Sequence, residues 1–166
     1  NMTAKELIAM GRYAWNGLFG RETEADKQAI ARALKLTHTE KFADQLVDTL
    51  SGGERSRIWL AMLLAQESQF LLLDEPLAAL DIAHQVEVMQ LVHRLSRELN
   101  LGVIIVIHDI NLASRFCDHL VALHSGKLLA QGNAHNIVNT PSLQQIYGIE
   151  LNVIEHPQTH RPVSFY

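Results

Sequence analysis

The chain has little cysteine and no long apolar run, and each shortage excludes a class of protein. Its one cysteine, Cys117, cannot form an internal disulfide, which is typical of a reducing compartment. The longest apolar run, Ile58–Ala65, has eight residues. A helix that crosses a bilayer needs roughly 18 or more. We therefore expect neither a disulfide scaffold nor a transmembrane segment.

An excess of basic charge is also missing. The 14 Lys and Arg residues against 18 Asp and Glu residues leave a net charge of −4, whereas a general nucleic-acid binder is normally basic. With 48% hydrophobic residues over 166 positions, the chain can bury a core, which excludes disorder. It opens on Asn1 without a signal-peptide pattern, and this predicts a start inside a longer protein.

The first 68 residues show helical patterns. Thr3 can cap a segment with apolar residues at helical spacing, and Glu24–Leu36 repeats that spacing with acids in its first turn, where the helix dipole favours them. Ser51 begins a further helix that runs through Leu64. A glycine- and aromatic-rich stretch over residues 11–20 predicts a loop. We expect a helical domain at residues 1–68.

From residue 69 onward the pattern changes to α/β. Two short apolar runs, 70–73 and 103–107, flank an amphipathic helix over 83–99, which predicts a βαβ unit with parallel strands. Because both runs are apolar throughout, helices should cover both faces of the pair. Beyond it we expect a short helix at 110–116, then a hairpin about residues 125–126, two short helices and an extended tail.

Polar residues follow both predicted strands. Asp74 and Glu75 end the first, and His108 and Asp109 end the second, at the edge where open parallel sheets bind ligands. An acid pair after a buried strand is typical of a Mg-nucleotide site. There the first acid holds the metal and the second orients or activates water. The structural alternative for Asp74 and Glu75 is an isolated acid pair in a solvated turn. Asp109, beside His108, is interpreted as structural.

A second candidate motif is Leu50-Ser51-Gly52-Gly53-Glu54. Ser51 with Glu54 three residues later forms a capping box. A cap does not need two glycines, which lower helix propensity by about 1 kcal/mol each. They favour close backbone approach to a phosphate at a helix start, and both interpretations can hold together. The nine histidines show no metal-site spacing. Apart from His108 we expect them at the surface or in caps.

The order of these motifs resembles the ATP-binding subunit of ABC transporters. The motifs are Leu50–Glu54 (signature), Leu71–Pro76 (Walker B with its catalytic glutamate), Ala79-Leu80-Asp81 (D-loop) and His108-Asp109 (switch histidine). The flanking segments Asp81–Gln85, His108–Asn111 and Ile146-Tyr147-Gly148-Ile149 are similar to the iron-siderophore importers, above all the ferric-hydroxamate type. The resemblance runs over essentially the whole chain.

The resemblance implies a fold and a set of roles. The fold is α/β, a partial P-loop NTPase core with parallel strands flanked by helices: residues 1–68 form the helical signature subdomain and 69–166 the C-terminal part of the RecA-like core. ATP and Mg²⁺ are the implied ligands. The implied roles are Asp74 for Mg²⁺, Glu75 for water, His108 for the γ-phosphate, and Ser51, Gly52, Gly53, Glu54 and Asp81 for nucleotide contacts across a dimer.

The implied partners are a second ATPase subunit and the integral-membrane permease of a siderophore importer, with no nucleic acid. The implied location is peripheral, on the cytoplasmic face of the inner membrane. A permease could dock on the aromatic residues Tyr13, Trp15 and Phe19, although local packing also explains them.

The sequence departs from the family pattern in two respects. The D-loop segment Pro76–Asp81 lacks two hydroxyl side chains that the family usually has. More importantly, the 166 residues contain no Gly-x-x-x-x-Gly-Lys-Ser/Thr phosphate loop, which in the family precedes these motifs. We therefore expect the chain alone to be inactive. The alternatives are a non-catalytic truncated product or permease-docking module, and a soluble ABC ATPase acting on DNA or ribosomes, against which the acidic balance counts.

Overall fold

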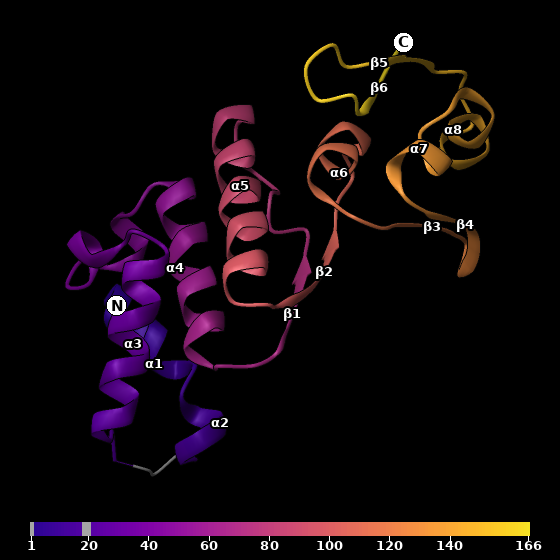
Figure 1. Ribbon diagram of the computed structural model, residues 1–166. Helices are drawn as coiled ribbons and strands as arrows, with labels where there is room; N and C mark the ends of the chain where they lie inside the picture. The colour runs from indigo at the N-terminus through magenta and orange to yellow at the C-terminus, as the bar shows by residue number, and fades with distance from the viewer. Residues whose placement is uncertain (1, 18–20) are drawn as a thin grey trace. The chain divides into compact units, whose positions relative to one another are not determined.

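A computed structural model describes residues 2–17 and 21–166 (Figure 1). The chain divides into two compact units, Asn1–Val106 and Ile107–Tyr166, and each is described by itself. The first unit contains both the helical segment and the βαβ segment expected from the sequence. The expected subdomain boundary at 68/69 lies inside this unit and stays a prediction.

Helices and short turns build the beginning of the first unit. They are α1 (Ala4–Met10), α2 (Tyr13–Asn16), α3 (Glu24–Leu36) and α4 (Gly52–Ala65), with short 3-10 turns at Glu40–Phe42 and Val47–Thr49. Capping boxes open α1, α3 and α4, because in each the cap hydroxyl and the acid three residues later exchange hydrogen bonds. The core shared by these helices contains Ile8, Ile30 and Ile58. The stretch expected as a loop contains α2, and Phe19 lies outside the described residues.

The βαβ prediction is confirmed. Strands β1 (Phe70–Asp74) and β2 (Gly102–Val106) pair in parallel with Asp74 opposite Val106, and α5 (Ile82–Glu98) connects them. Leu71 and Leu73 are buried. The alternate side chains of the pair are exposed: Phe70 by 66%, Leu72 by 72%, Ile104 by 64% and Val106 by 48%. The expectation that helices cover both faces is therefore wrong for this structure. The four exposed residues are called the open sheet face.

The open sheet face predicts self-association, because a contiguous apolar patch and unpaired strand edges favour contact with another chain. Replacing Leu72, which lies opposite Ile104, by glutamate is expected to shift the chain toward monomer at tens of micromolar concentration. Light scattering measures this shift. Ile82→Glu is the matched control, since Ile82 is exposed but lies outside the face. A monomeric wild-type chain at that concentration would contradict the prediction.

The second unit contains α6 (Ile110–Phe116), the antiparallel pair β3 (Leu120–His124) and β4 (Lys127–Gly132), α7 (Ala134–Ile137), α8 (Thr140–Tyr147), and the antiparallel pair β5 (Asn152–Glu155) and β6 (Pro162–Phe165). Its core includes Leu120, Ile137 and Leu143. The tail expected as a single extended segment is therefore a hairpin. His156 Nδ1 accepts the backbone N–H of Gln158 and Thr159 and so shapes its turn.

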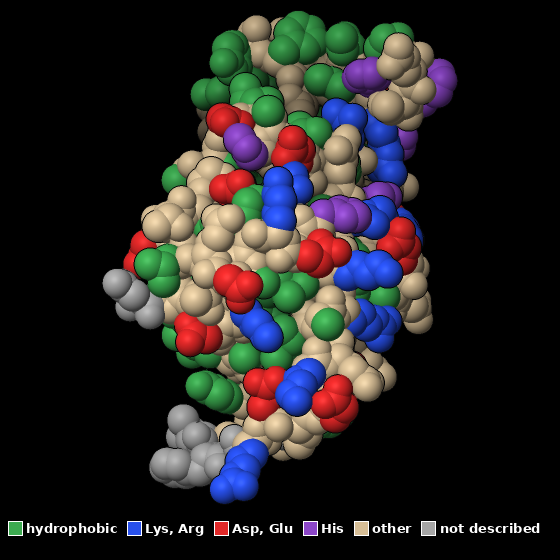
Figure 2. Space-filling model, turned by 90° about the vertical axis from the view of Figure 1, so that its left-hand side faces the viewer, with side chains coloured by type: hydrophobic (Ala, Val, Ile, Leu, Met, Phe, Trp, Pro, Cys, Tyr) green, Lys and Arg blue, Asp and Glu red, His purple; other side chains and the backbone are tan. Residues whose placement is uncertain are grey.

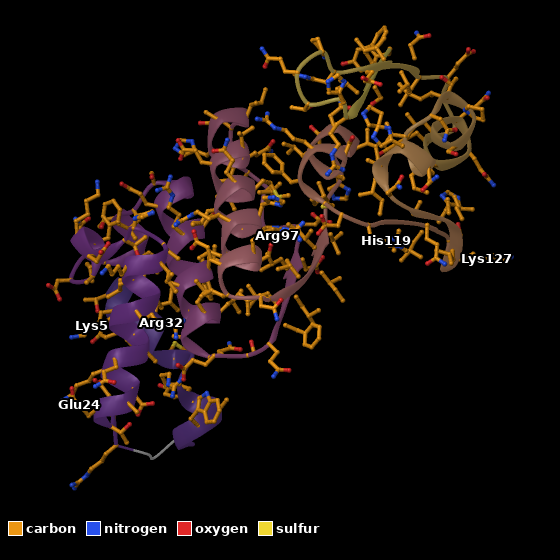
Figure 3. All side chains as sticks on the ribbon, viewed as in Figure 1. Lys5, Glu24, Arg32, Arg97, His119 and Lys127 are labelled. Atoms are coloured by element: carbon orange, nitrogen blue, oxygen red, sulfur yellow. The ribbon has the colours of Figure 1, made fainter. Side chains whose placement is uncertain are left out.

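Surface charges are mixed on the face that Figure 2 shows, where Lys and Arg side chains lie among Asp and Glu side chains. Figure 3 shows Glu24 at the beginning of α3 and Arg32 further along the same helix. Glu24 thus lies in the first turn of α3, where the helix dipole stabilises a negative charge. Among the described residues, no helix has both the length and the apolar character needed to cross a bilayer.

Candidate functional site

The beginning of α4 carries the signature motif. The Glu54 side chain accepts the Ser51 N–H at 2.8 Å, and the Ser51 hydroxyl accepts the Glu54 N–H at 3.4 Å. Hydrogen bonds from Ser51 lower the pKa of Glu54. The N–H groups of Gly52 and Gly53 have no hydrogen-bond partner among the described residues. Gly52 is exposed, but Gly53 is buried. The capping-box interpretation is confirmed, and Gly52 offers an open N–H for an anion.

The two acids lie at the end of β1. Asp74 is the last residue of β1. It is exposed and pairs with Val106, the last residue of β2. Glu75 follows with φ 46°, a left-handed conformation that is unusual for a non-glycine residue. Such a conformation costs roughly 1–3 kcal/mol and clusters at functional sites. Glu75 is also exposed, so its carboxylate can reach a ligand at this edge.

The D-loop segment passes from the acids to α5. Asp81 is the N-cap of α5, and its carboxylate accepts the His84 N–H at 2.9 Å. Hydrogen bonds from the backbone and the ring of His84 lower the pKa of Asp81. A Cβ added to Gly52 would lie 3.1 Å from Leu80 Cδ2, so the D-loop lies against the beginning of α4. The first unit thus brings the signature motif and Asp81 together.

The predicted switch residue His108 belongs to the second unit and is exposed. The Tyr147 hydroxyl of α8 donates to the His108 carbonyl oxygen at 3.3 Å. Asp109 caps α6 by accepting the N–H groups of Asn111 and Leu112, at 2.7 and 3.0 Å. The structural interpretation of Asp109 is confirmed. Tyr147 was only part of a family-like segment in the sequence, and its contact with the His108 loop depends on the fold.

Tyr147 is expected to ionise late. Partial burial is the larger cause, and the negative charge of Asp109 is the second; together they raise the pKa of Tyr147 above its ordinary value of 10.0. Because the folded state holds this proton more tightly, the resulting stability is present below pH 10.0 and is lost as the pH rises through the folded-state pKa. The difference in phenolate absorbance between wild type and Tyr147→Phe measures the midpoint. A midpoint at or below 10.0 would be inconsistent with this burial.

A buried arginine that the sequence did not single out, Arg12, lies against Trp15, one of the predicted docking residues. Arg12 donates to Asp26 at 2.8 Å, to the Ala65 carbonyl at 2.7 Å and to Glu67 at 2.8 Å. Its guanidinium lies 5.3 Å from the centre of the Trp15 ring. These contacts join the end of α1, the beginning of α3 and the end of α4. The only local signal was the capping acid Asp26, and its partner Arg12 is remote in sequence.

The residues that the structure describes contain no group of three or more His, Cys, Asp or Glu side chains that could hold a metal ion. Magnesium in nucleotide sites needs only one or two protein carboxylates, because phosphate oxygens and water complete its shell. Exposed Asp74 at the strand end fits that donor set. The open N–H of Gly52 fits an anionic phosphate. Asp74 and the Gly52 N–H are therefore each chemically suited to one part of a Mg-nucleotide.

The sequence comparisons identify the class of protein. The family described as "ABC transporter" matches residues 1–78. The chain is 43% identical over 163 residues to the ferric enterobactin transport ATP-binding protein of Escherichia coli (strain K12), covering 98% of this chain and 60% of the relative. It is 39% identical over 162 residues to the iron(3+)-hydroxamate import ATP-binding protein of Bacillus subtilis (strain 168), with the same coverage.

The solved structures agree. A metal-chelate type ABC transporter in an inward-facing conformation matches with a TM-score of 0.90 and 25% identity, over 99% of this chain and 66% of that chain. Residues 1–78 thus match the ABC transporter family, and the whole chain is similar to ATP-binding subunits of such transporters; its α/β fold, with a small parallel sheet and flanking helices, is the fold of the matched structure. Among such subunits, the chain is similar to those of iron-siderophore importers. It spans about 60% of the length of these two relatives.

Proposed function

We propose that this chain supplies the signature motif, Walker B acids, D-loop and switch histidine of an ATP-hydrolysing subunit of an iron-siderophore importer. The observation that carries the proposal is the strained, exposed Glu75 directly after Asp74, at the carboxyl end of a parallel strand. Residues with strained backbone cluster at functional sites, and here the strained residue directly follows a second acid at a strand end. The names of the relatives support iron-siderophore transport as the process served.

In the proposed mechanism each motif has one task. Asp74 would hold Mg²⁺, which neutralises phosphate charge when it is bound. Glu75 would orient the attacking water and take its proton. His108 would contact the γ-phosphate. Ser51 and Gly52 would donate to the phosphates of the nucleotide held by a second subunit, where the positive end of α4 adds to the attraction.

The proposed partners follow from that arrangement. A second ATPase subunit would complete each nucleotide site, and an integral-membrane permease would be driven by the opening and closing of the pair. We place the complete subunit at the cytoplasmic face of the membrane as a peripheral protein. The phosphates also need a glycine-rich loop with its lysine, which the 166 residues do not contain.

The expected result for the chain alone is no saturable binding of Mg-ATP at micromolar concentration. The phosphate-loop donors that carry much of the affinity are absent from this sequence, and Asp74 and Glu75 repel a polyanion that brings no Mg²⁺. Calorimetric titration measures this. A chimera that joins the phosphate-loop segment of the Escherichia coli relative to this chain is expected to bind and hydrolyse ATP; it is called the completed chimera.

Ser51→Arg tests the role of the signature motif. In the completed chimera it is expected to block hydrolysis by occupying the space of the partner's phosphate, while each monomer still binds ATP. Ser68→Arg, on an exposed residue before β1, adds the same charge elsewhere and is the matched control. Micromolar binding by the chain alone, or full hydrolysis in Ser51→Arg, would contradict the proposal.

A second candidate function is a non-catalytic module that docks on a permease. The exposed side chains of Tyr13 and Trp15 favour it, because Arg12 and the Gln66 carbonyl hold the Trp15 ring in place. Trp15→Ala tests the docking role. It is expected to abolish co-purification with a permease and to leave ATP hydrolysis by the completed chimera unchanged; retained co-purification would contradict docking at Trp15.

A further inference from the structure

Two helices of the first unit begin side by side. The signature helix α4 begins at Gly52, and the D-loop helix α5 begins at Ile82; the two helices pack against each other. The link between their first turns is His84. Its ring Nδ1 lies 2.8 Å from both carboxylate oxygens of Asp81, the N-cap of α5.

The other edge of the His84 ring lies on the signature motif. A Cβ added to Gly53 would collide with ring atom Cδ2 of His84 and would lie 3.1 Å from its Cγ and Nε2. Gly53 is accordingly buried, whereas Gly52 is exposed. The imidazole is therefore held between a carboxylate of the D-loop and the backbone of the signature glycine.

A second link follows one turn further along both helices. Arg57 of α4 donates to Glu87 of α5 at 2.5 Å. Residues three and four apart lie on the same face of a helix, so the contact between 53 and 84 and the contact between 57 and 87 form one seam. The beginning of α4 is thus attached to the beginning of α5 at two successive turns.

Helix capping alone does not account for this arrangement. The cap needs only the Asp81 side chain and the backbone N–H of residue 84, which almost any residue would supply. The ring bond to Asp81 and the glycine at position 53 are additional. Because glycine in a helix costs about 1 kcal/mol relative to alanine, a glycine that is buried under an imidazole has a packing reason of its own.

We propose that His84 is a positioning residue that joins the D-loop to the signature motif of the same chain, so that a displacement at the beginning of α4 moves Asp81 with it. Only the functional role of this link rests on the proposed function. If Ser51 and Gly52 bind the nucleotide of a second subunit, His84 carries the resulting shift to the D-loop and the acids before it. The link itself needs no nucleotide.

The first test measures the link in the 166-residue chain. A carboxylate can only accept, so the ring nitrogen Nδ1 beside Asp81 has to donate. Nitrogen NMR should therefore show the neutral His84 ring in the tautomer protonated at Nδ1. Asp81→Asn is expected to weaken that preference, and Gly53→Ala should displace the ring and do the same. A neutral ring that shows no tautomer preference, or one that Asp81→Asn leaves unchanged, would overturn the proposal.

The second test is a double-mutant cycle on the thermal midpoint. Gly53→Ala is expected to lower the midpoint when His84 is present and to raise it in the His84→Ala background, because only helix propensity then remains. The Gln90→Ala background, on an exposed face of α5, is the matched control and should keep the loss. If Gly53→Ala lowers the thermal midpoint equally with His84 and with His84→Ala, the ring does not contact Gly53.

The third test measures coupling. Ser51→Asn keeps a competent cap and slightly changes the beginning of α4. The amide signals of Asp81 and Ile82 are expected to shift in response when His84 or the hydrogen-bonding variant His84→Gln is present, and to stay unchanged in His84→Ala. Equal shifts in all three backgrounds would overturn the coupling. Since no nucleotide is added, failure here is distinct from failure of the ATPase proposal, which the completed chimera tests.

Discussion

Replacing Glu75 by glutamine is expected to lower ATP turnover of the completed chimera by about 10²–10⁴-fold while ATP binding persists. Glutamine keeps the size and backbone of the residue but cannot take a proton from water. Phosphate release and nucleotide binding, measured on the same preparation, separate the two effects. The variant should also favour a closed, ATP-bound dimer, which light scattering detects. Near-normal turnover in Glu75→Gln would remove Glu75 from the catalytic role.

The backbone of Glu75 provides an independent test in the chain alone. Because Glu75 has φ 46°, glycine should fit the position better. Glu75→Gly is expected to raise the free energy of unfolding by about 0.5–1 kcal/mol, the left-handed cost less the extra entropy of glycine. In the completed chimera the same change should abolish turnover. A gain in stability together with a loss of activity would show that the glutamate side chain is kept at this position at the expense of stability.

Ser125→Gly is the matched control for that backbone effect. Ser125 has φ 48° in the turn between β3 and β4, far along the chain from the acids. It should gain similar stability and leave turnover unchanged. If Glu75→Gly destabilises the chain while Ser125→Gly stabilises it, a side-chain contact of Glu75 outweighs the backbone strain, and the argument from strain fails.

Replacing Arg12 by methionine is expected to lower the free energy of unfolding by about 3–5 kcal/mol, because it removes one side of the buried ion pair between Arg12 and Asp26. The side chains of Arg12 and Asp26 are only 8% and 2% exposed. The change also removes a cap from the Ala65 carbonyl at the end of α4. Urea unfolding followed by circular dichroism measures the loss, and the slope with urea should stay unchanged.

The exposed pair of Lys27 and Glu24 provides the control. Their side chains are 58% and 73% exposed, so solvent screens the attraction and Lys27→Met should cost no more than about 0.5 kcal/mol. Equal losses in the two methionine variants would show that Arg12 contributes no more than a surface ion pair. Arg12→Lys is expected to recover only part of the stability, since lysine cannot present the same fork of donors.

Local chemistry explains which parts of the fold could be predicted from the sequence. The caps at Thr3 and Ser51 were recognisable because their hydrogen bonds join residues three apart. The strand at 70–74 and its parallel partner followed from apolar runs around an amphipathic helix. The short helix α2 and the tail hairpin were missed, because a four-residue helix and a four-residue strand leave weak periodic signals.

The candidate site divides in the same way. The order of the motifs predicted a resemblance to ABC transporter ATP-binding subunits, and the comparisons confirm that resemblance, whereas the roles of Asp74, Glu75 and His108 stay predictions. From the sequence, the two glycines at 52 and 53 were explained by close approach of the backbone to a phosphate. The structure adds a different reason at Gly53, which lies under the His84 ring. No pattern in the sequence places residue 84 beside residue 53.

The sequence by itself determined the longer helices, the parallel strand pair, the caps at Thr3 and Ser51 and the resemblance to ABC transporter ATP-binding subunits, because those signals are carried by neighbouring residues and by motif order. Only the tertiary structure decided that Arg12 is buried against Asp26 and Glu67, that Leu72 lies on an exposed face, and that His84 joins two motifs. Each of these depends on which surfaces meet when helices and strands pack. Packing brings together residues that are remote along the chain, so no local pattern records it.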